Sequence, residues 1–243
     1  MQPYKAETYG ERVADVYDEW YKDYDPAAVD RLVELAGGGR ALELGIGTGR
    51  LAVPLAERGV DIHGIDAAPS MVARLRAKPE GESIAVSIGD FAEVNVPGEF
   101  ALIYVVFNTF FALLTQEAQV QCFRNIAAHL APGGCFLIEA FVPDLKRFEG
   151  EQTNRATRVT IERVELDIAQ HERAVQQVVG QKVVITDGQV SLYPIQIRYA
   201  WPAELDLMAQ LAGLHLSERW SDWQRSPFTS QSGKHISLYH SAA

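Results

Sequence analysis

Three glycines lie close together in the stretch Arg40–Arg50, which reads RALELGIGTGR. Gly45, Gly47 and Gly49 follow one short apolar run and precede another, so we expect a strand, a tight turn and the start of a helix. Glycine adopts positive φ readily, and the first N–H groups of a helix have no intrahelical partners. The stretch therefore predicts a place where the backbone closely approaches a ligand.

The spacing of this loop argues against a pyrophosphate ligand. The dinucleotide fingerprint is GxGxxG or GxGxxA, whereas this loop reads GxGxGR. Arg50 occupies the position where the fingerprint has a small residue, which lets the helix pack closely on the strand. The carboxylate of Glu43 precedes the loop and disfavours a phosphate. The loop therefore indicates a cationic or amino-bearing ligand.

Two further carboxylates follow the next two expected strands. Asp66 ends a strand expected over residues 60–66, where it could hold a ribose diol through charge-assisted hydrogen bonds. Asp90 follows a strand expected over residues 84–88, where it could accept from the exocyclic amine of adenine. Met71, in the helix between them, could pack on the adenine ring. An aminoacyl tail, a diol and an adenine together describe S-adenosylmethionine.

These motifs resemble the class I S-adenosylmethionine-dependent methyltransferases, in the branch that acts on small molecules. The E/DxGxGxG signature is Glu43–Gly49, the acid after the second strand is Asp66, and the GD pair is Gly89-Asp90. The resemblance covers residues 8–142. It implies a Rossmann-like, doubly wound α/β fold with seven strands in the order 3-2-1-4-5-7-6, strand 7 being antiparallel, and transfer of a methyl group to N or O of a small-molecule acceptor.

The predicted cofactor residues come from the N-terminal arm, the glycine loop and the strand ends. They are Tyr17, Glu43, Gly45, Gly47, Gly49, Asp66, Ala67, Met71, Gly89, Asp90, Phe91 and Phe107. Two alternatives stay open: an NAD-type Rossmann oxidoreductase, which the early third glycine disfavours, and a non-catalytic protein that binds S-adenosylmethionine.

Strands and helices alternate in the first part of the chain, which predicts a parallel sheet covered on both faces. Two helices are expected first, over residues 8–24 and 26–37. The strands are expected at 41–45, 60–66, 84–88, 100–106 and 135–141, with helices at 48–58, 69–77 and 116–130. Pro54 is expected to kink its helix slightly, because proline removes a backbone hydrogen bond.

The pattern changes to alternating β after Pro143. Three runs are expected, around residues 159–168, 175–185 and 190–197, with a hairpin turn at 186–188. A helix at 202–212 and strands at 214–223 and 235–240 close the chain. We predict one domain, residues 1–243. Its parts are an N-terminal helical arm or lid (1–37), a cofactor-binding core (38–142), an antiparallel β insertion (143–200) and the final helix and strands of the core (201–243).

The acceptor pocket is expected between the arm, the loop after the fourth strand and the insertion. Its predicted residues are Trp20, Tyr21, Asn108, Phe111, Tyr193 and Tyr199. The loop after the fourth strand lacks the prolines of the (N/D)PP(Y/F) tetrad, which argues against an enzyme that acts on nucleic-acid bases. The Tyr-rich opening and the β insertion also resemble sugar-nucleotide and glycine/sarcosine N-methyltransferases, although the histidine that the sugar enzymes carry near Ala112 is missing here.

No residue stands out as a general base, so the catalytic group is unknown. The candidates are Tyr17, Glu139 and His235, with Asp144 and His240 as further titratable groups near strand ends. His63 is interpreted as a packing residue and His171 as a solvated one in a turn of the insertion. No His, Cys, Asp or Glu cluster has metal-ligand spacing, so we expect no metal.

Composition excludes several classes of function. The net charge of −10 disfavours nucleic acid, and no apolar run reaches the roughly 18 residues that would predict a membrane span. The N-terminus is too polar for a signal peptide, and Cys122 and Cys135 look like buried thiols. We therefore expect a cytoplasmic protein whose partner is a small-molecule acceptor. The insertion is expected either to roof the pocket or to pair two copies in a homodimer.

Overall fold

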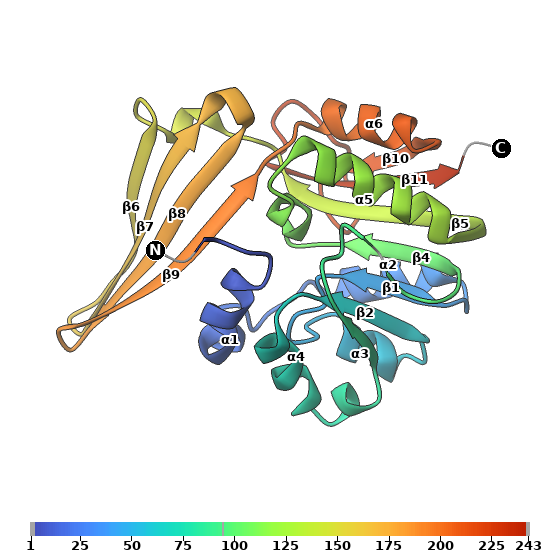
Figure 1. Ribbon diagram of the computed structural model, residues 1–243, viewed down its shortest axis with the longest axis horizontal. Helices are drawn as coiled ribbons and strands as arrows, with labels where there is room; N and C mark the ends of the chain where they lie inside the picture. The colour runs from blue at the N-terminus through green and yellow to red at the C-terminus, as the bar shows by residue number, and fades with distance from the viewer. Residues whose placement is uncertain (1–2, 94, 242–243) are drawn as a thin grey trace.

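The main sheet has seven strands, and their order confirms the predicted topology. The computed structural model describes residues 3–93 and 95–241. The strands in spatial order are β3 (Ala85–Ile88), β2 (Ile62–Asp66), β1 (Ala41–Leu44), β4 (Phe100–Val105), β5 (Leu130–Phe141), β11 (Lys234–Ser241) and β10 (Leu214–Trp220). β11 is antiparallel to β5, whereas β1 to β5 pair in parallel (Figure 1).

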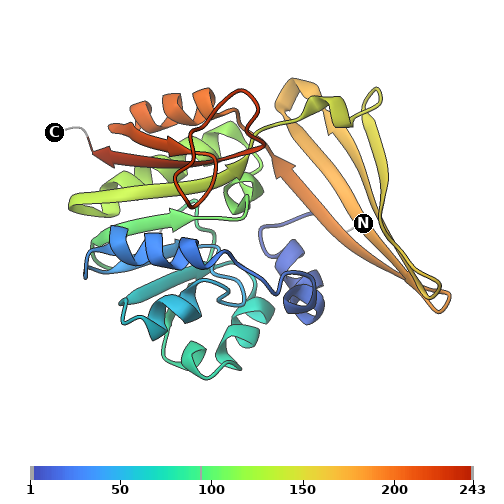
Figure 2. The ribbon, with the colours of Figure 1, turned by 180° about the vertical axis from the view of Figure 1, so that it is seen from behind.

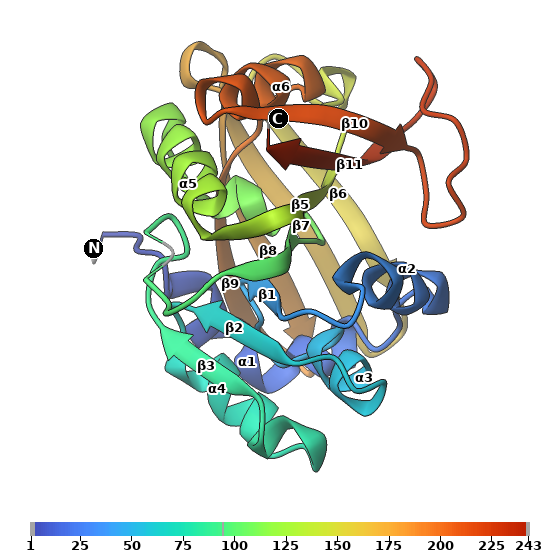
Figure 3. The ribbon, with the colours of Figure 1, turned by 90° about the vertical axis from the view of Figure 1, so that its right-hand side faces the viewer.

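Helices cover both faces of this sheet, as the alternating pattern predicted. They are α2 (Pro26–Ala36), α3 (Ala52–Glu57), α4 (Pro69–Arg76), α5 (Gln116–His129) and α6 (Pro202–Leu211). Alternate residues of β4 point to opposite cores. Ile103 belongs to the core shared with α5 and α6, while Leu102 belongs to the core shared with α2 and α3. Figure 3 shows α5 and α6 on one side of the sheet and α2 and α3 on the other.

A second, four-stranded antiparallel sheet forms the insertion. Its strands pair in chain order as β6 (Gln152–Val159), β7 (Arg163–Glu172), β8 (Gln177–Thr186) and β9 (Gln189–Arg198). The predicted hairpin between β8 and β9 is confirmed, and Asp187 and Gly188 turn it with φ of 51° and 76°. The first predicted run was wrong, because a turn containing the fully exposed Ile161 divides it into β6 and β7.

Helix α1 (Thr8–Trp20) lies between the two sheets, against α4 and β9 (Figures 1 and 2). It ends at Trp20, earlier than the predicted residue 24. Asp25 then caps α2 by accepting a hydrogen bond from the N–H of Ala27 (2.9 Å). Tyr21, with φ of −128° and ψ of 54°, is outside the helical region, so the first helix cannot continue beyond Trp20.

The predicted kink at Pro54 is also corrected. Helix α3 begins at Ala52, so Pro54 stands in the first turn, where its missing N–H would have no intrahelical partner in any case. Short 3₁₀ helices lie at η1 (Glu80–Glu82), η2 (Thr109–Ala112), η3 (Leu145–Arg147) and η4 (Arg173–Val175).

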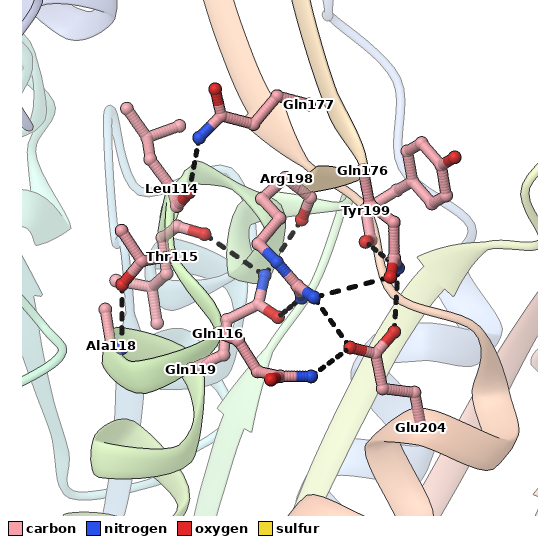
Figure 4. Close-up of polar contacts among 11 residues, drawn as sticks. Leu114, Thr115, Gln116, Ala118, Gln119, Gln176, Gln177, Arg198, Tyr199 and Glu204 are labelled. Atoms are coloured by element: carbon pink, nitrogen blue, oxygen red, sulfur yellow. Dashed lines mark hydrogen bonds and ion pairs between the residues drawn. The ribbon is translucent and has the colours of Figure 1, made fainter. Parts of the chain in front are cut away.

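A buried polar network fastens the end of the insertion to the main sheet (Figure 4). Arg198, the last residue of β9, donates to Gln119 of α5 (2.6 Å) and to Glu204 of α6 (2.7 Å). Gln176 donates to the other oxygen of Glu204 (2.8 Å). Because Arg198 is buried and its partners are hydrogen-bonded in turn, this joint fixes where β9 meets the body.

Candidate functional site

A cavity of about 570 Å³ opens at the carboxyl ends of β1, β2 and β4. The glycine loop, the loops after β2, β3 and β4, helix α1 and strand β9 surround it. Its volume is in the range of small-molecule and cofactor sites. Its position at the strand ends, where the sheet order reverses, is the usual ligand site of open α/β sheets.

The glycine loop forms one wall of this cavity. Gly45 and Gly47 line it with φ of 74° and 55°. A Cβ on Gly45 would lie 2.4 Å from the Cγ2 atom of Thr109, so a side chain there would collide with the loop after β4. Gly49 does not line the cavity. A Cβ there would lie 2.3 Å from Leu75, so this glycine lets α4 pack against the loop.

Asp66 joins the glycine loop to the start of α4. One carboxylate oxygen accepts from the N–H of Gly47 (2.8 Å) and the other from the N–H of Ala68 (2.8 Å). Burial raises the pKa of this carboxyl, and the two backbone donors oppose that rise. A carboxylate has about four acceptor positions, so two remain for hydroxyl groups of a ligand in the cavity.

The predicted adenine side of the site comes together in space. Ala67, buried Met71, Asp90 and buried Phe91 all line the cavity. One oxygen of Asp90 accepts from the N–H of Ala92 (2.8 Å), which fixes the direction of the carboxylate. Gly89 does not line the cavity; its N–H donates to the backbone oxygen of Asp66 and holds the two strand ends together.

Glu43 lies beneath the loop instead of facing the cavity. It is buried and accepts a hydrogen bond from the hydroxyl of Tyr104 (2.9 Å). Burial raises the pKa of Glu43 to about 8, against the opposing effects of that hydrogen bond and of Arg50. The predicted direct contact with a ligand is therefore not what the geometry gives, and Glu43 acts on the cavity from behind the loop.

This raised pKa predicts an effect on stability. The folded state favours the protonated carboxyl, so the stability that Glu43 contributes is complete below its unfolded pKa of about 4.5 and is lost as the pH rises to about 8. In Glu43→Gln, which keeps an acceptor for Tyr104, thermal unfolding at pH 5 and pH 8 is expected to depend less on pH than in the wild type. Parallel curves for the two proteins would contradict the assignment.

Arg50 is a cavity residue that the sequence analysis considered only as a misfit in the fingerprint. Its guanidinium carbon lies 3.4 Å from the ring centre of Phe107, and its Nη2 donates to the hydroxyl of Tyr17 (3.4 Å). Its Nε is buried without a hydrogen-bond partner, and among the described residues it forms no ion pair. A half-buried cation with this surplus donor is suited to a carboxylate.

Helix α1 is fixed above this end of the cavity by polar contacts. Asp18 accepts from the hydroxyl of Thr48 in the glycine loop (2.5 Å) and pairs with Lys78 (3.0 Å). Glu11 accepts from the N–H of Ser70 at the start of α4 (2.9 Å). Tyr17 and Tyr21 of the arm thereby line the cavity.

The far end of the cavity carries an ion pair. The Oε1 atom of Glu139, near the end of β5, lies 2.8 Å from the Nζ of Lys234 in β11, and both residues line the cavity. The other oxygen of Glu139 accepts from the N–H of Phe107 (3.3 Å). Asn108 also lines the cavity, but its side-chain oxygen accepts from Phe141 (2.7 Å) and supports the loop.

Among the catalytic candidates, the structure therefore favours Glu139. Burial raises the pKa of Tyr17 to about 12, so its hydroxyl is a donor at neutral pH and not a base. His235 is buried in β11 outside the cavity, where its Nδ1 contacts the hydroxyl of Ser237 (2.8 Å). Burial lowers the pKa of His235 to about 4.

Four predicted acceptor residues do not line the cavity. Phe111 is fully buried in the core. Trp20 and Tyr193 pack on each other, with ring centres 4.7 Å apart, and thereby join α1 to β9. Tyr199 is buried and hydrogen-bonded to His171 (2.9 Å). His171 itself is buried and stacked on a phenylalanine, so the interpretation of this histidine as solvated was wrong.

The cavity contains residues that the sequence analysis did not select. They include Tyr4, Tyr9, Lys234 and the β9 residues Ile195 and Ile197. Alternation along β9 could have indicated one apolar face, but not which face turns inward. Lys234 had no local signal, because it reaches the cavity only through the pairing of β11 with β5.

The sheet order, the glycine loop and the carboxylates at the strand ends define a class I methyltransferase fold. A sequence family described as "Methyltransferase domain" matches residues 41–134. The CcbJ methyltransferase from Streptomyces caelestis is 36% identical, with a TM-score of 0.92 over 99% of this chain and 100% of that chain. This chain belongs to the S-adenosylmethionine-dependent methyltransferases. That assignment removes the oxidoreductase alternative.

Two further relatives extend the comparison. The cypemycin N-terminal methyltransferase from a Streptomyces species is 28% identical over 196 residues, which cover 80% of each chain. The structure of CalS10, an amino pentose methyltransferase from Micromonospora echinaspora with S-adenosylmethionine bound, has a TM-score of 0.67 at 20% identity, over 92% of this chain and 96% of that one. The second likeness is one of fold.

The structure describes residues 3–93 and 95–241. These residues contain no helix with the length and apolar character that a membrane crossing requires. Within the same described ranges, no group of three or more His, Cys, Asp or Glu side chains is arranged to hold a metal ion.

Proposed function

We propose that this enzyme transfers a methyl group from S-adenosylmethionine, bound in the cavity, to an amine nitrogen of a small acceptor. The cofactor supplies an electrophilic methyl group on a sulfonium. Glu139 would accept the proton of an acceptor ammonium, the freed nitrogen would attack the methyl carbon in line, and the electrons of the carbon–sulfur bond would remain on the leaving thioether. The observation that carries the proposal is the joint presence of Asp66, Asp90 and Arg50 around one cavity.

The cavity residues fit the three parts of this cofactor. Asp66 has acceptor positions left for the ribose hydroxyls. Asp90, Met71 and Phe91 offer an acceptor and apolar surface for adenine. Arg50, with its unpartnered Nε, is the counter-ion for the carboxylate of the aminoacyl tail. Glu43 lies behind the loop with its pKa raised to about 8, and a positively charged ligand in the cavity would lower that pKa and favour the ionised carboxylate.

The residues at the Glu139 end of the cavity favour an amine acceptor over a hydroxyl acceptor. Methylation of a hydroxyl is helped by a strong base, and no histidine lines the cavity among the described residues. Glu139 instead offers a buried carboxylate that can hold an ammonium group and receive its proton. The relatives support the same class, since one is named an N-terminal methyltransferase and another an amino pentose methyltransferase.

Positioning and exclusion of water account for the remaining catalysis. Tyr17 from α1, Tyr21 directly after it, and Ile195 and Ile197 from β9 enclose the space between cofactor and acceptor. Aromatic faces also attract cations, including a protonated amine. We propose that the arm and the insertion together form the roof of the acceptor pocket.

Calorimetry with S-adenosylhomocysteine tests the cofactor, and a panel of small amines matched with the corresponding alcohols tests the acceptor. We expect binding of the cofactor product, no binding of NAD, and methyl transfer to amines only. Failure to bind S-adenosylhomocysteine at millimolar concentration would overturn the proposal. Transfer only to alcohols would overturn the nitrogen assignment alone.

Arg50→Gln is expected to weaken binding of the aminoacyl tail of the ligand without changing binding of its nucleoside. Loss of one charge-assisted interaction weakens binding of S-adenosylhomocysteine about ten-fold. Binding of 5′-methylthioadenosine, which has no aminoacyl tail, is expected to stay the same. Calorimetry with both ligands measures the difference, and equal losses for the two would contradict the role given to Arg50.

A further inference from the structure

The two faces of the insertion sheet differ sharply in chemistry. Side chains alternate between faces along each strand. The inner face is identified by contacts with α1: Tyr193 packs on Trp20, Lys182 lies over the same indole, and Arg163 pairs with Glu19. This face is strongly charged, since Arg158, Arg163 and Lys182 surround the buried Glu165.

The outer face is mainly apolar toward the hairpin tips, and its polar positions are mostly amides. Strand pairing puts Val159 beside Val164, Leu192 beside Val183, and Val190 beside Ile185. Val159, Ile168, Val179, Val190 and Leu192 are between 43% and 70% exposed. Single exposed apolar side chains are ordinary on a protein surface, but a contiguous apolar patch marks an interaction site.

This face also lacks charge in a chain of which 22% of residues are charged. From the hairpin tips to the junction with the body, its polar positions carry only Asn or Gln. Charged residues stand only at its junction end, at Glu172 and Arg198. In Figures 1 and 2 the sheet leans away from the body, and no described element lies over its outer face.

We propose that the outer face of β6 to β9 is the interface of a homodimer, in which the sheets of two copies pack face to face. An isologous interface joins the same patch on both subunits, and an uncharged apolar face is complementary to itself. The chain as a whole carries a net charge of −10, so its charged surfaces repel a second copy. The outer face is the region where two copies meet without opposing like charges.

The area of the outer face is large enough for an interface with a second copy of the chain. Three strands of 10 residues and one of 8 form it. At about 3.3 Å per residue and about 4.8 Å between strands, it covers roughly 600 Å². Two copies would bury about 1,200 Å², which reaches the lower limit of specific, stable interfaces. Two such sheets pack with their strands about 30° apart.

Pairing through an edge strand fits less well. The edge strand β6 contains a bulge between Ala156 and Arg158 and carries Arg155 and Arg158. Bulges and charges protect sheet edges from pairing with other strands. An anionic membrane is also disfavoured, because the acidic chain is repelled from it. The face, and not the edge, is therefore the contact.

Light scattering after size exclusion tests the proposal on the full chain. The wild type is expected to be a dimer. Leu192→Glu is expected to weaken the dimer about 100-fold or more, because each copy then buries a carboxylate against the other. Leu207→Glu is the control, since Leu207 is similarly exposed on α6 of the body, and it is expected to leave the dimer intact.

Circular dichroism would verify that both variants are folded. A monomeric wild type, or a dimer that Leu192→Glu leaves intact while Leu207→Glu disrupts it, would overturn the proposal. A second variant, Val179→Glu on the neighbouring strand, is expected to repeat the effect of Leu192→Glu. These measurements need no cofactor or acceptor, so they are independent of the proposed function.

Discussion

Asp66→Ala is expected to raise the dissociation constant of S-adenosylhomocysteine about 5- to 150-fold. Two hydrogen bonds from the ribose hydroxyls to a charged acceptor would be lost, which corresponds to about 1–3 kcal/mol. The variant also releases the N–H groups of Gly47 and Ala68, which Asp66 holds in the free protein (both 2.8 Å). The loss therefore includes some disorder of the glycine loop.

Calorimetry on three proteins separates these contributions. Asp61→Ala removes the same charge from an exposed position just before the same strand, and its affinity is expected to equal that of the wild type. Asp66→Asn keeps an acceptor oxygen and is expected to lie between wild type and alanine variant. Because the ribose is common to both ligands, Asp66→Ala should also weaken 5′-methylthioadenosine, unlike Arg50→Gln. An unchanged dissociation constant would exclude the ribose role.

The cofactor half of this site could be predicted because its signals are local. Gly45 and Gly47 are followed within one βαβ unit by Asp66, and each residue stands at the end of a strand whose apolar pattern is unambiguous. Parallel strands bring their carboxyl ends to one edge of the sheet. Once the strand order was inferred, the meeting of Asp66 and Asp90 in one cavity followed without knowledge of distant contacts.

The wrong predictions share a physical cause. A sequence pattern indicates which side chains share a face of a strand, but not how deeply each side chain is buried. Glu43 precedes the loop as expected, yet it points beneath it, where burial and Tyr104 control its charge. Phe111 and Tyr199 lie close in sequence to cavity residues but fill the core. Alternation in the insertion likewise showed two faces, and only the contact with Trp20 decided which one is inside.

Glu139→Gln is expected to lower kcat/KM for an amine acceptor about 100-fold or more, the scale of a lost acid–base group. Glutamine keeps the shape of the side chain and an oxygen for the N–H of Phe107, but it cannot neutralise an ammonium or receive its proton. Affinity for S-adenosylhomocysteine is expected to stay constant. The matched control is Glu99→Gln, which changes an exposed carboxylate just before β4, at the amino end of that strand, whereas the cavity lies at the carboxyl ends.

Lys234→Met tests whether Glu139 or Lys234 of the ion pair binds the acceptor. Lys234 is 45% exposed at its side chain, whereas Glu139 is 7% exposed, so the carboxylate is the more costly charge to leave unpaired. If the acceptor ammonium replaces Lys234 beside Glu139, the methionine variant keeps its activity toward amines and only Glu139→Gln loses it. If Lys234 instead binds an anionic group of the acceptor, the order of the two effects is reversed, and the assignment of Glu139 as the amine partner fails.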